Sequence, residues 1–267
     1  MSYGPAIWRD IVRIRDEAPL VHNITNYVAM NLTANALLAL GASPVMAHAD
    51  EEVEEMAGLA SALVLNIGTL SPAWIGSMRK AAAAARRRGV PIVLDPVGAG
   101  ATRFRTETSR LLLEEARPTV LRGNASEIRA LFHGEHETKG VDSRQAPEAA
   151  LDAARGLSAE FGCAVSVSGP VDVIVYQDAV VRVANGHSLM PRVTGLGCTA
   201  SALTGAFAAV NPSPLAAAVH AMAVMGIAGE MAGEGAAGPA GFQTLFLDAL
   251  YRLSEKDIAG RLRTEPA

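Results

Sequence analysis

Short apolar runs alternate with longer helical patterns along most of the 267-residue chain, and this alternation constrains the fold more than any other feature. The predicted strands are Leu20–His22, Ser43–Met46, Ala62–Asn66, Pro91–Leu94, Thr119–Leu121, Ala164–Ser168, Val171–Tyr176 and Ala179–Val183. The predicted helices are Met30–Leu40, Glu51–Gly58, Ala73–Arg88, Thr106–Ala116, Ser126–Phe132, Ala146–Phe161, Cys198–Val210, Pro214–Met231 and Gly241–Leu253. Strands that alternate with helices form βαβ units, so the pattern predicts an α/β fold with a mostly parallel sheet. The last two strands, joined by Gln177-Asp178, are predicted to form a β-hairpin.

The chain is predicted to form one domain over residues 1–267. It contains no repeat of fixed period and no linker long enough to divide it. Half of the residues are apolar and 19% are charged, which is a globular composition. A chain of this length can bury a sizeable core.

Composition argues against several classes of partner. The net charge is -4 and aromatic residues make up 4%, so neither a basic stripe nor a base-stacking surface for nucleic acid is expected. The two cysteines form no CxxC pair, which argues against a zinc site and a disulfide framework. Apolar runs such as Leu215–Val224 are too short to predict a membrane span, and Met1–Leu20 lacks the apolar core of a signal peptide. We therefore expect a cytoplasmic protein with no membrane partner.

The segment Thr194-Gly195-Leu196-Gly197-Cys198 is predicted to be a glycine-rich turn that opens a helix. The free N–H groups and the dipole of a helix N-terminus form an anion site. The same field lowers the pKa of a thiol, so Cys198 is expected to ionise near neutral pH and to serve as a base. The alternative is an ordinary turn with a buried, inert cysteine. The segment lacks the lysine of a Walker P-loop.

Two further turns follow buried strands. Asp95, in Leu94-Asp95-Pro96-Val97-Gly98-Ala99-Gly100, lies at a strand end, where α/β sheets place ligands, and could hold Mg²⁺ through water. Its structural alternative is an Asx-turn before proline. In Arg122-Gly123-Asn124-Ala125-Ser126-Glu127, Asn124 and Glu127 have the spacing of a helix capping box. Alternatively, Asn124 and Glu127 organise Mg²⁺ and phosphates, with Arg122 beside a phosphate.

Two weaker signals lie elsewhere. His22-Asn23-Ile24-Thr25-Asn26-Tyr27 is dense in hydrogen-bonding side chains and is either a capped turn or a small-molecule contact near Met46. Ser168 ends a strand, where it is either a plain turn serine or a contact to a nucleotide. The histidines at 48, 133, 136, 187 and 220 show no metal-binding spacing.

These motifs, in this order, resemble the hydroxyethylthiazole kinase family, a branch of the ribokinase-like superfamily. The resemblance covers nearly the whole chain, and the order and spacing of the motifs carry it. It implies a ribokinase-like three-layer α/β/α sandwich. The implied reaction is ATP-dependent phosphorylation of the alcohol of 4-methyl-5-(2-hydroxyethyl)thiazole, a step of thiamine salvage.

The resemblance also implies roles for individual residues. Cys198 matches the position at which most ribokinase-like enzymes carry an aspartate base. Arg122 and Ser168 match contacts to ATP, with Asn124 and Gly197 beside the phosphates. Met46, Asn26 and the backbone of Gly195 match the thiazole site, and Asp95 and Glu127 match acids near Mg²⁺. The implied assembly is a homotrimer with the substrate site at a subunit boundary.

One residue departs from the family pattern. Leu196 stands between the two glycines, where the family usually has threonine. The backbone donors remain, but a hydroxyl that could contact a phosphate is lost. The expected consequence concerns rate or nucleotide preference and leaves the reaction class unchanged.

Three other functions stay open at this point. A kinase of hydroxymethylpyrimidine or pyridoxal, or an ATP-dependent dehydratase of hydrated nicotinamide nucleotides, would share the fold. Both usually carry aspartate where Cys198 stands. A non-catalytic nucleotide- or thiazole-binding regulator is the third possibility, against which the full set of polar motifs argues.

Overall fold

The computed structural model describes residues 3–133 and 146–266. Its centre is one sheet of strands in the order β2-β1-β3-β4-β5-β6-β7-β8-β9. The strands are β1 (Leu20–Ile24), β2 (Ser43–Val45), β3 (Ala62–Asn66), β4 (Ile92–Asp95), β5 (Val120–Asn124), β6 (Ala164–Ser168), β7 (Asp172–Tyr176), β8 (Ala179–Val183) and β9 (Thr264–Pro266). The first six strands run parallel, and β7, β8 and β9 are added antiparallel. The predicted mostly parallel sheet and the β7–β8 hairpin are confirmed.

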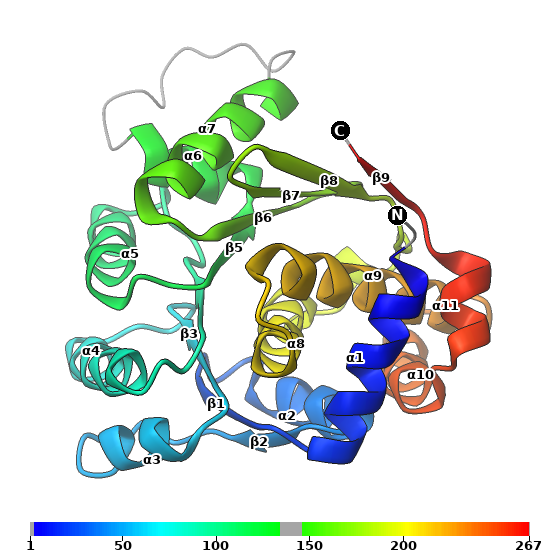
Figure 1. The fold of residues 1–267 in the computed structure, drawn as a ribbon, viewed down its shortest axis with the longest axis horizontal. Coiled ribbons are helices and arrows are strands. Elements are labelled where there is room, and N and C mark those ends of the chain that lie inside the picture. Colours follow the sequence, from blue (N-terminus) through cyan, green and yellow to red (C-terminus); the bar gives the residue numbers. More distant parts are fainter. Residues whose placement is uncertain (1–2, 134–145, 267) are drawn as a thin grey trace.

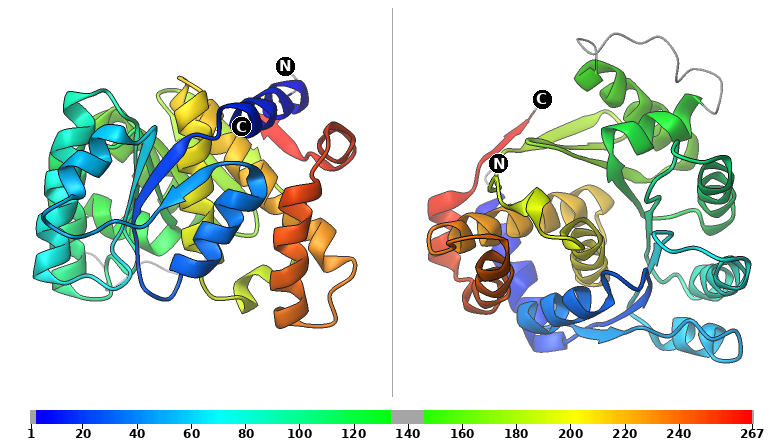
Figure 2. Two further views of the ribbon diagram at one scale, coloured as in Figure 1. Left: turned by 90° about the horizontal axis from the view of Figure 1, so that it is seen from below. Right: turned by 180° about the vertical axis from the view of Figure 1, so that it is seen from behind.

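Helices cover both faces of this sheet and make three layers (Figure 1). One face carries α3 (Val53–Leu59), α4 (Pro72–Arg87), α5 (Arg103–Ala116), α6 (Ala125–His133) and α7 (Ala146–Phe161). The other carries α1 (Gly4–Glu17), α2 (Met30–Leu40), α8 (Leu196–Val210), α9 (Pro214–Gly233), α10 (Pro239–Arg252) and α11 (Glu255–Arg261). Each face has its own apolar cluster, and the two views of Figure 2 separate these layers.

Within the described residues, two α-helices and one strand escaped the sequence-based prediction, α1, α11 and β9, as did the short 3-10 helix Met190–Arg192. Helix α1 is amphipathic, and its apolar stripe, which includes Ile7, Ile11 and Ile14, is fully buried. Charged residues between these positions hide the stripe from a search for apolar runs. Strand β9 is only three residues long and pairs with β8 at Val181, Arg182 and Val183. Its extended conformation therefore depends on this pairing and not on a local sequence pattern.

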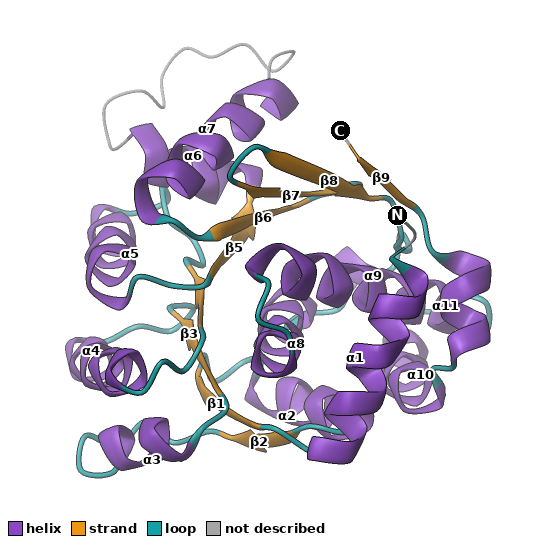
Figure 3. Cartoon of the chain, viewed as in Figure 1, coloured by secondary structure: helices purple, strands orange, loops and turns teal. Residues whose placement is uncertain are grey.

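Helix α8 lies at the centre of its layer, between the sheet and α1, α2 and α9 (Figure 3). All of its 15 residues are buried except Gly197, Cys198 and Ala209. A Cβ on Gly205 would come within 2.8 Å of Val64 Cγ2, so glycine permits the close approach of this helix to β3. The sheet and its neighbours therefore fix α8, and two of its three accessible residues lie in its first turn.

Helix α9 corrects one prediction. It is 20 residues long with a mean hydropathy of 1.5, so by length and composition it is long enough to cross a membrane. The judgement that no apolar segment reaches this length is therefore wrong for Pro214–Gly233. Of its most apolar window, 78% is buried inside the protein, so the fold accounts for its composition.

Candidate active site

Polar side chains gather where the parallel strands end. Asn66 ends β3 and Asp95 ends β4, and the two residues are direct partners in the register of these strands. Asn26 follows β1, and Arg122 lies on β5. Because parallel strands end at one edge of a sheet, four separate segments meet beside the first turn of α8.

Asp95 is the buried acid of this group. Asn66 Nδ2 and Ser201 Oγ both donate to its Oδ2 atom, each over 2.7 Å. Burial is the main reason that the pKa of Asp95 is raised to about 6, against the attraction of Arg122 and the two hydrogen bonds. No side chain of the described residues donates a hydrogen bond to Oδ1. One carboxylate oxygen is thus held in place, and the other remains available to a ligand.

Cys198 lies in the first turn of α8, as predicted, but its thiol does not ionise easily. Burial and the charge of Asp95 raise the pKa of Cys198, and they outweigh the hydrogen bonds and the charge of Arg122 that act in the opposite direction. The prediction of a pKa near neutrality is therefore wrong: a helix N-terminus favours the thiolate, but desolvation costs more. Asn26 Nδ2 donates to Cys198 Sγ over 3.1 Å and thereby orients the sulfur.

The two glycines before Cys198 differ in what they contribute. Gly195 is the N-cap of α8 with φ of 86°, a left-handed conformation that strains any residue with a side chain. Gly197 is exposed, and the nearest described atom to a Cβ placed there would be Arg122 Nη1, at 3.9 Å. The backbone turn depends on Gly195, whereas Gly197 leaves the first amides of the helix open to the cavity.

Asn124 and Glu127 form the predicted capping box. Glu127 Oε2 accepts from the backbone N–H of Asn124 over 2.8 Å, and Asn124 Oδ1 accepts from the N–H of Glu127 over 3.0 Å. Glu127 Oε1 accepts from Gly98 N–H over 2.8 Å, which ties the turn after β4 to the turn after β5. Both oxygens of Glu127 are therefore already engaged by backbone donors.

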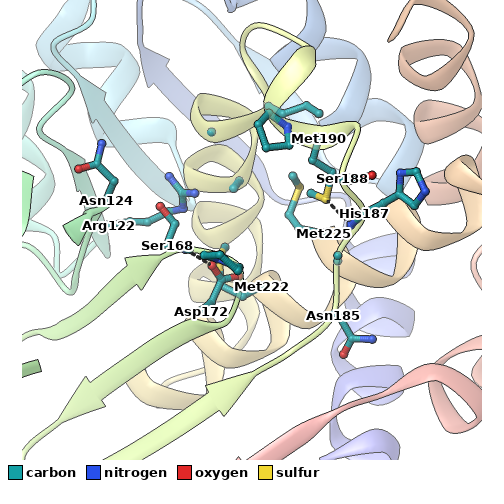
Figure 4. A pocket seen from close by; sticks show the side chains of 18 residues that line it. Arg122, Asn124, Ser168, Asp172, Asn185, His187, Ser188, Met190, Met222 and Met225 are labelled. Atoms are coloured by element: carbon teal, nitrogen blue, oxygen red, sulfur yellow. Dashed lines mark hydrogen bonds between the residues drawn. The ribbon is translucent and has the colours of Figure 1, made fainter. Parts of the chain in front are cut away.

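A cavity of about 670 Å³ opens beside this edge of the sheet (Figure 4). Arg122, Asn124 and Ser168 line one side, and Gly197 and Ala200 present the start of α8. Three methionines from two segments also line it, Met190, Met222 and Met225, together with the polar residues Asn185, His187 and Ser188. The cavity thus combines one cation and several polar groups with flexible apolar side chains, a combination that suits a ligand with a charged end and a flat end.

The predicted site residues fall into three groups. Arg122, Asn124, Ser168 and Gly197 line the cavity, while Asn26, Asp95 and Cys198 belong to the hydrogen-bonded network beside it. Gly195 and Glu127 shape the turns that carry these residues. Met46 is the exception: it follows β2 at the edge of the sheet and does not line this cavity.

Sequence reasoning missed Asn66, Ser201 and Asp172. Asp172 lines the cavity, where its Oδ1 accepts from Gly169 N–H over 3.0 Å and burial raises its pKa. Asn66 ends a correctly predicted strand, so a rule that examines every polar strand end would have found it. Ser201 lies inside an alanine-rich helix and carries no sequence signal. Among the described residues, no group of three or more His, Cys, Asp and Glu could hold a metal ion.

Comparison with known proteins agrees with these findings. The model of the hydroxyethylthiazole kinase family matches residues 11–256. A hydroxyethylthiazole kinase of Syntrophus aciditrophicus is 62% identical over 96% of this chain and 95% of its own length. A solved hydroxyethylthiazole kinase structure from Pyrococcus horikoshii has a TM-score of 0.91 at 47% identity, covering 98% of this chain and 99% of that chain.

A more distant comparison supports the fold. A ribokinase-like superfamily protein from Enterococcus faecalis has a TM-score of 0.62 at 12% identity and covers 86% of both chains, a likeness that concerns the fold alone. The predicted ribokinase-like sandwich is thereby confirmed. The family resemblance noted in the sequence is confirmed as well, because the matches extend over nearly the whole chain: the protein belongs to the hydroxyethylthiazole kinase family.

Proposed function

We propose that the protein transfers the γ-phosphoryl group of ATP to the alcohol of 4-methyl-5-(2-hydroxyethyl)thiazole, as a step of thiamine salvage. Membership of a kinase family makes ATP the phosphoryl donor. One observation carries the assignment to this site: the open first turn of α8 joins the cavity wall at Gly197 to the network at Cys198. A phosphoryl group at this turn would have the donor cavity on one side and an oriented thiol on the other.

The nucleotide would occupy the cavity with its phosphates toward the polar wall. Arg122 supplies a cation, and the exposed Gly197 lets phosphate oxygens approach the first N–H groups of α8. Ser168 and Asn124 add hydrogen-bonding groups on the same wall. The methionines of the lining suit a flat base, because flexible thioether side chains adapt to its shape.

The residues also fit a magnesium ion, held through few protein ligands. Mg²⁺ usually binds one or two carboxylates together with substrate phosphates and water. Asp95 meets this need with its Oδ1, while Glu127 acts mainly through the two turns that its oxygens join. When bound, the ion would neutralise charge on the phosphates.

Catalysis then depends on orientation and on charge stabilisation. Phosphoryl transfer passes through a loose transition state, so the protein contributes chiefly by positioning the two reacting groups. Asn26 and the Gly195 backbone would hold the thiazole alcohol beside Cys198, in line with the γ-phosphoryl group. The thiolate form of Cys198 accepts the alcohol proton late in the transfer, and Arg122 and the first amides of α8 stabilise the developing charge.

We further propose that the protein is a cytoplasmic homotrimer whose thiazole site lies at a subunit boundary. Tyr27 and Val28, which directly follow Asn26, are 64% and 62% exposed. Strand β2 is an edge strand, and Met46 follows it. A neighbouring subunit seated here would bring Met46 of one chain toward Asn26 of another. Light scattering during size-exclusion chromatography tests the stoichiometry, and a monomeric mass at micromolar concentration would contradict it.

The decisive experiment for the function is a substrate screen. ATP consumption is measured with hydroxyethylthiazole, hydroxymethylpyrimidine and pyridoxal, and the products are identified by mass spectrometry. We expect a phosphorylated thiazole, with EDTA abolishing turnover and added Mg²⁺ restoring it. Phosphorylation of another alcohol with none of the thiazole would overturn the assignment. Binding of ATP and thiazole without turnover would indicate a regulator.

A further inference from the structure

Two side-chain amides connect the buried acid of the site to its thiol. Asn66 Nδ2 donates to Asp95 Oδ2 over 2.7 Å, and Asn66 Oδ1 accepts from Asn26 Nδ2 over 2.8 Å. Asn26 Nδ2 also donates to Cys198 Sγ over 3.1 Å. The result is a continuous hydrogen-bonded chain from β4 through β3 and the end of β1 to α8.

This chain has a fixed direction, and Asp95 defines it. An ionised carboxylate only accepts hydrogen bonds, so Asn66 must turn its NH₂ group toward Asp95 and its oxygen toward Asn26. Asn26 must in turn present its NH₂ group, which therefore reaches the sulfur. Backbone donors support the same orientations: Gly68 N–H donates to Asn66 Oδ1 over 2.9 Å, and Ala29 N–H donates to Asn26 Oδ1 over 3.0 Å.

Burial makes the arrangement costly to disturb. Asn66 is 1% exposed and Asn26 is 5% exposed, so water cannot replace a lost partner at little cost. A Cβ on Gly68 would come within 2.8 Å of Asn26 Cβ, so the turn after β3 closely confines the Asn26 side chain. Asn66 is the member that contacts both the acid and the second amide.

We propose that Asn66 is a positioning residue for the phosphoryl transfer, which holds the Asp95 carboxylate in place and turns the Asn26 amide toward Cys198. The proposal rests on the proposed function for its kinetic consequence only. Asn66 acts through Asp95 and Asn26, and its own amide also lowers the pKa of the Cys198 thiol. Without it, the acid and the thiol would remain in the site but would lose their common orientation.

The test compares the full-length wild type with Asn66→Ala and Asn66→Asp. The aspartate variant keeps the side-chain size and an acceptor for Asn26 and Gly68 but removes the donor to Asp95. We expect both variants to lose about 10- to 100-fold in kcat, because small misplacements of reacting groups have effects of this size. KM for ATP should stay within about threefold, since the cavity residues are untouched. Asn35→Ala is the matched control, because Asn35 is exposed on α2 and its side-chain amide donates to Asn31 in the same helix.

A second readout does not depend on the reaction. Alkylation of Cys198 by iodoacetamide is followed by peptide mass spectrometry across a pH series without substrates, and the buried Cys163 serves as an internal reference. Asp95 and Arg122 are the charged groups that act on the Cys198 thiol, and both are retained in the alanine variant. Loss of the oriented amide should move the midpoint upward by about 0.5 to 1 pH unit, the size expected for one hydrogen bond.

The outcomes separate this inference from the proposed function. If the wild type phosphorylates the thiazole while both Asn66 variants keep its kcat and alkylation midpoint, the role of Asn66 is refuted and the function stands. If the wild type does not phosphorylate the thiazole, the function fails, and the alkylation midpoint of Asn66→Ala alone decides the positioning role. Should the alanine variant fail to fold, Asn66→Ser takes its place, because it adds no charge beside Asp95 and Cys198: wild-type kcat and midpoint refute the role, and the expected losses support it.

Discussion

Two buried aspartates, Asp95 and Asp10, occupy opposite kinds of environment. Asp10 on α1 is held by His220 Nδ1 over 2.7 Å and by Asn211 Nδ2 over 2.6 Å. Burial raises its pKa, but the two hydrogen bonds and the charges of His220 and Arg13 outweigh burial, so that the pKa of Asp10 is lowered. Among the described residues, the side chains that donate hydrogen bonds to the Asp95 carboxylate are both neutral, and its pKa is raised to about 6.

The ionised carboxylate of Asp10 therefore stabilises the folded protein, whereas the ionised carboxylate of Asp95 lowers its stability. Asp10 joins α1 to α9 and to the end of α8, and its charge is compensated locally. Asp95 is less well compensated and keeps an oxygen without a described partner. A buried acid with a raised pKa at the end of a strand is typical of a functional site.

The largest effect is expected at Cys198, beside which the accepting alcohol is proposed to bind. Cys198→Ala should lower kcat by about 10²- to 10⁴-fold, the usual worth of general-base assistance, and Cys198→Ser should fall between this variant and the wild type. Cys163→Ala is the matched control, because this second thiol is fully buried and its pKa is raised to about 12. A kcat close to that of the wild type in Cys198→Ala would remove the base role.

Neutralising the two aspartates tests the comparison directly. Asp95→Asn should lower kcat by about 10²-fold or more, because it removes a site charge. The same variant should gain about 1 to 3 kcal/mol in free energy of unfolding at pH 8, since it no longer buries an unfavourable charge. Asp10→Asn should lose about 3 kcal/mol and keep the kcat of the wild type. Chemical denaturation at pH 8 measures both stabilities, and changes of the same sign would contradict the distinction.

The pH dependence of stability should differ in sign between the two acids. Asp95 binds its proton more tightly in the folded state, so its contribution to stability falls as the pH rises from about 4 to about 6. Asp10 holds its charge more tightly when folded, so its contribution is present above pH 4 and is lost as the pH falls below that value. Melting temperatures of the wild type and the two asparagine variants from pH 3 to 8 provide the measurement.

Above pH 7, kcat should rise about tenfold over the first pH unit. The raised pKa of Cys198 keeps most of the protein in the thiol form at pH 7, so the fraction of base increases with pH. Below about pH 6, protonation of Asp95 should reduce kcat. In Cys198→Ala, kcat should no longer rise above pH 7 but should still fall below about pH 6. An equally steep alkaline rise in Cys198→Ala would assign it to another group.

The smallest effect concerns the residue that departs from the family pattern. Leu196 is buried and packs into the core around α8, so Leu196→Thr should cost about 1 to 2 kcal/mol of stability. The new hydroxyl lies beside the cavity and should change KM for ATP by only a few-fold. Leu203→Thr, in the same helix but fully buried, is the control that should lose stability without a change in KM. Equal KM values for ATP in the two variants would show that the side chain at position 196 does not affect nucleotide binding.

Much of the fold was predictable because apolar strands and helices alternate clearly. Strands β3, β6 and β8 were predicted at their observed bounds, since each is a short segment rich in apolar, mostly β-branched or small residues between turns. The predicted turns after β4 and β5 do meet, because Glu127 bonds to Gly98 and Asn124. Helix α1 was missed because its apolar positions are spaced by charges, and β9 because only pairing with β8 makes it a strand.

The site was less predictable, for reasons that depend on tertiary packing. Motif spacing identified Asp95 and Cys198, but the pKa of Cys198 follows from burial, which a local pattern does not contain. Asn66 gains its importance from the strand order, which sets it opposite Asp95. Ser201 contacts Asp95 only because α8 lies against the end of β4.

The confinement of α8 limits how a protein of this fold can acquire new substrates. Its first-turn amides cannot be reoriented without moving a helix that the sheet and three other helices enclose. On the proposed mechanism, any alcohol must be brought to this one fixed point, so acceptor specificity would depend on the surrounding turns, such as those after β1 and β2. Engineering of acceptor specificity should accordingly alter the segments around Tyr27 and Met46 and leave the sequence of α8 unchanged.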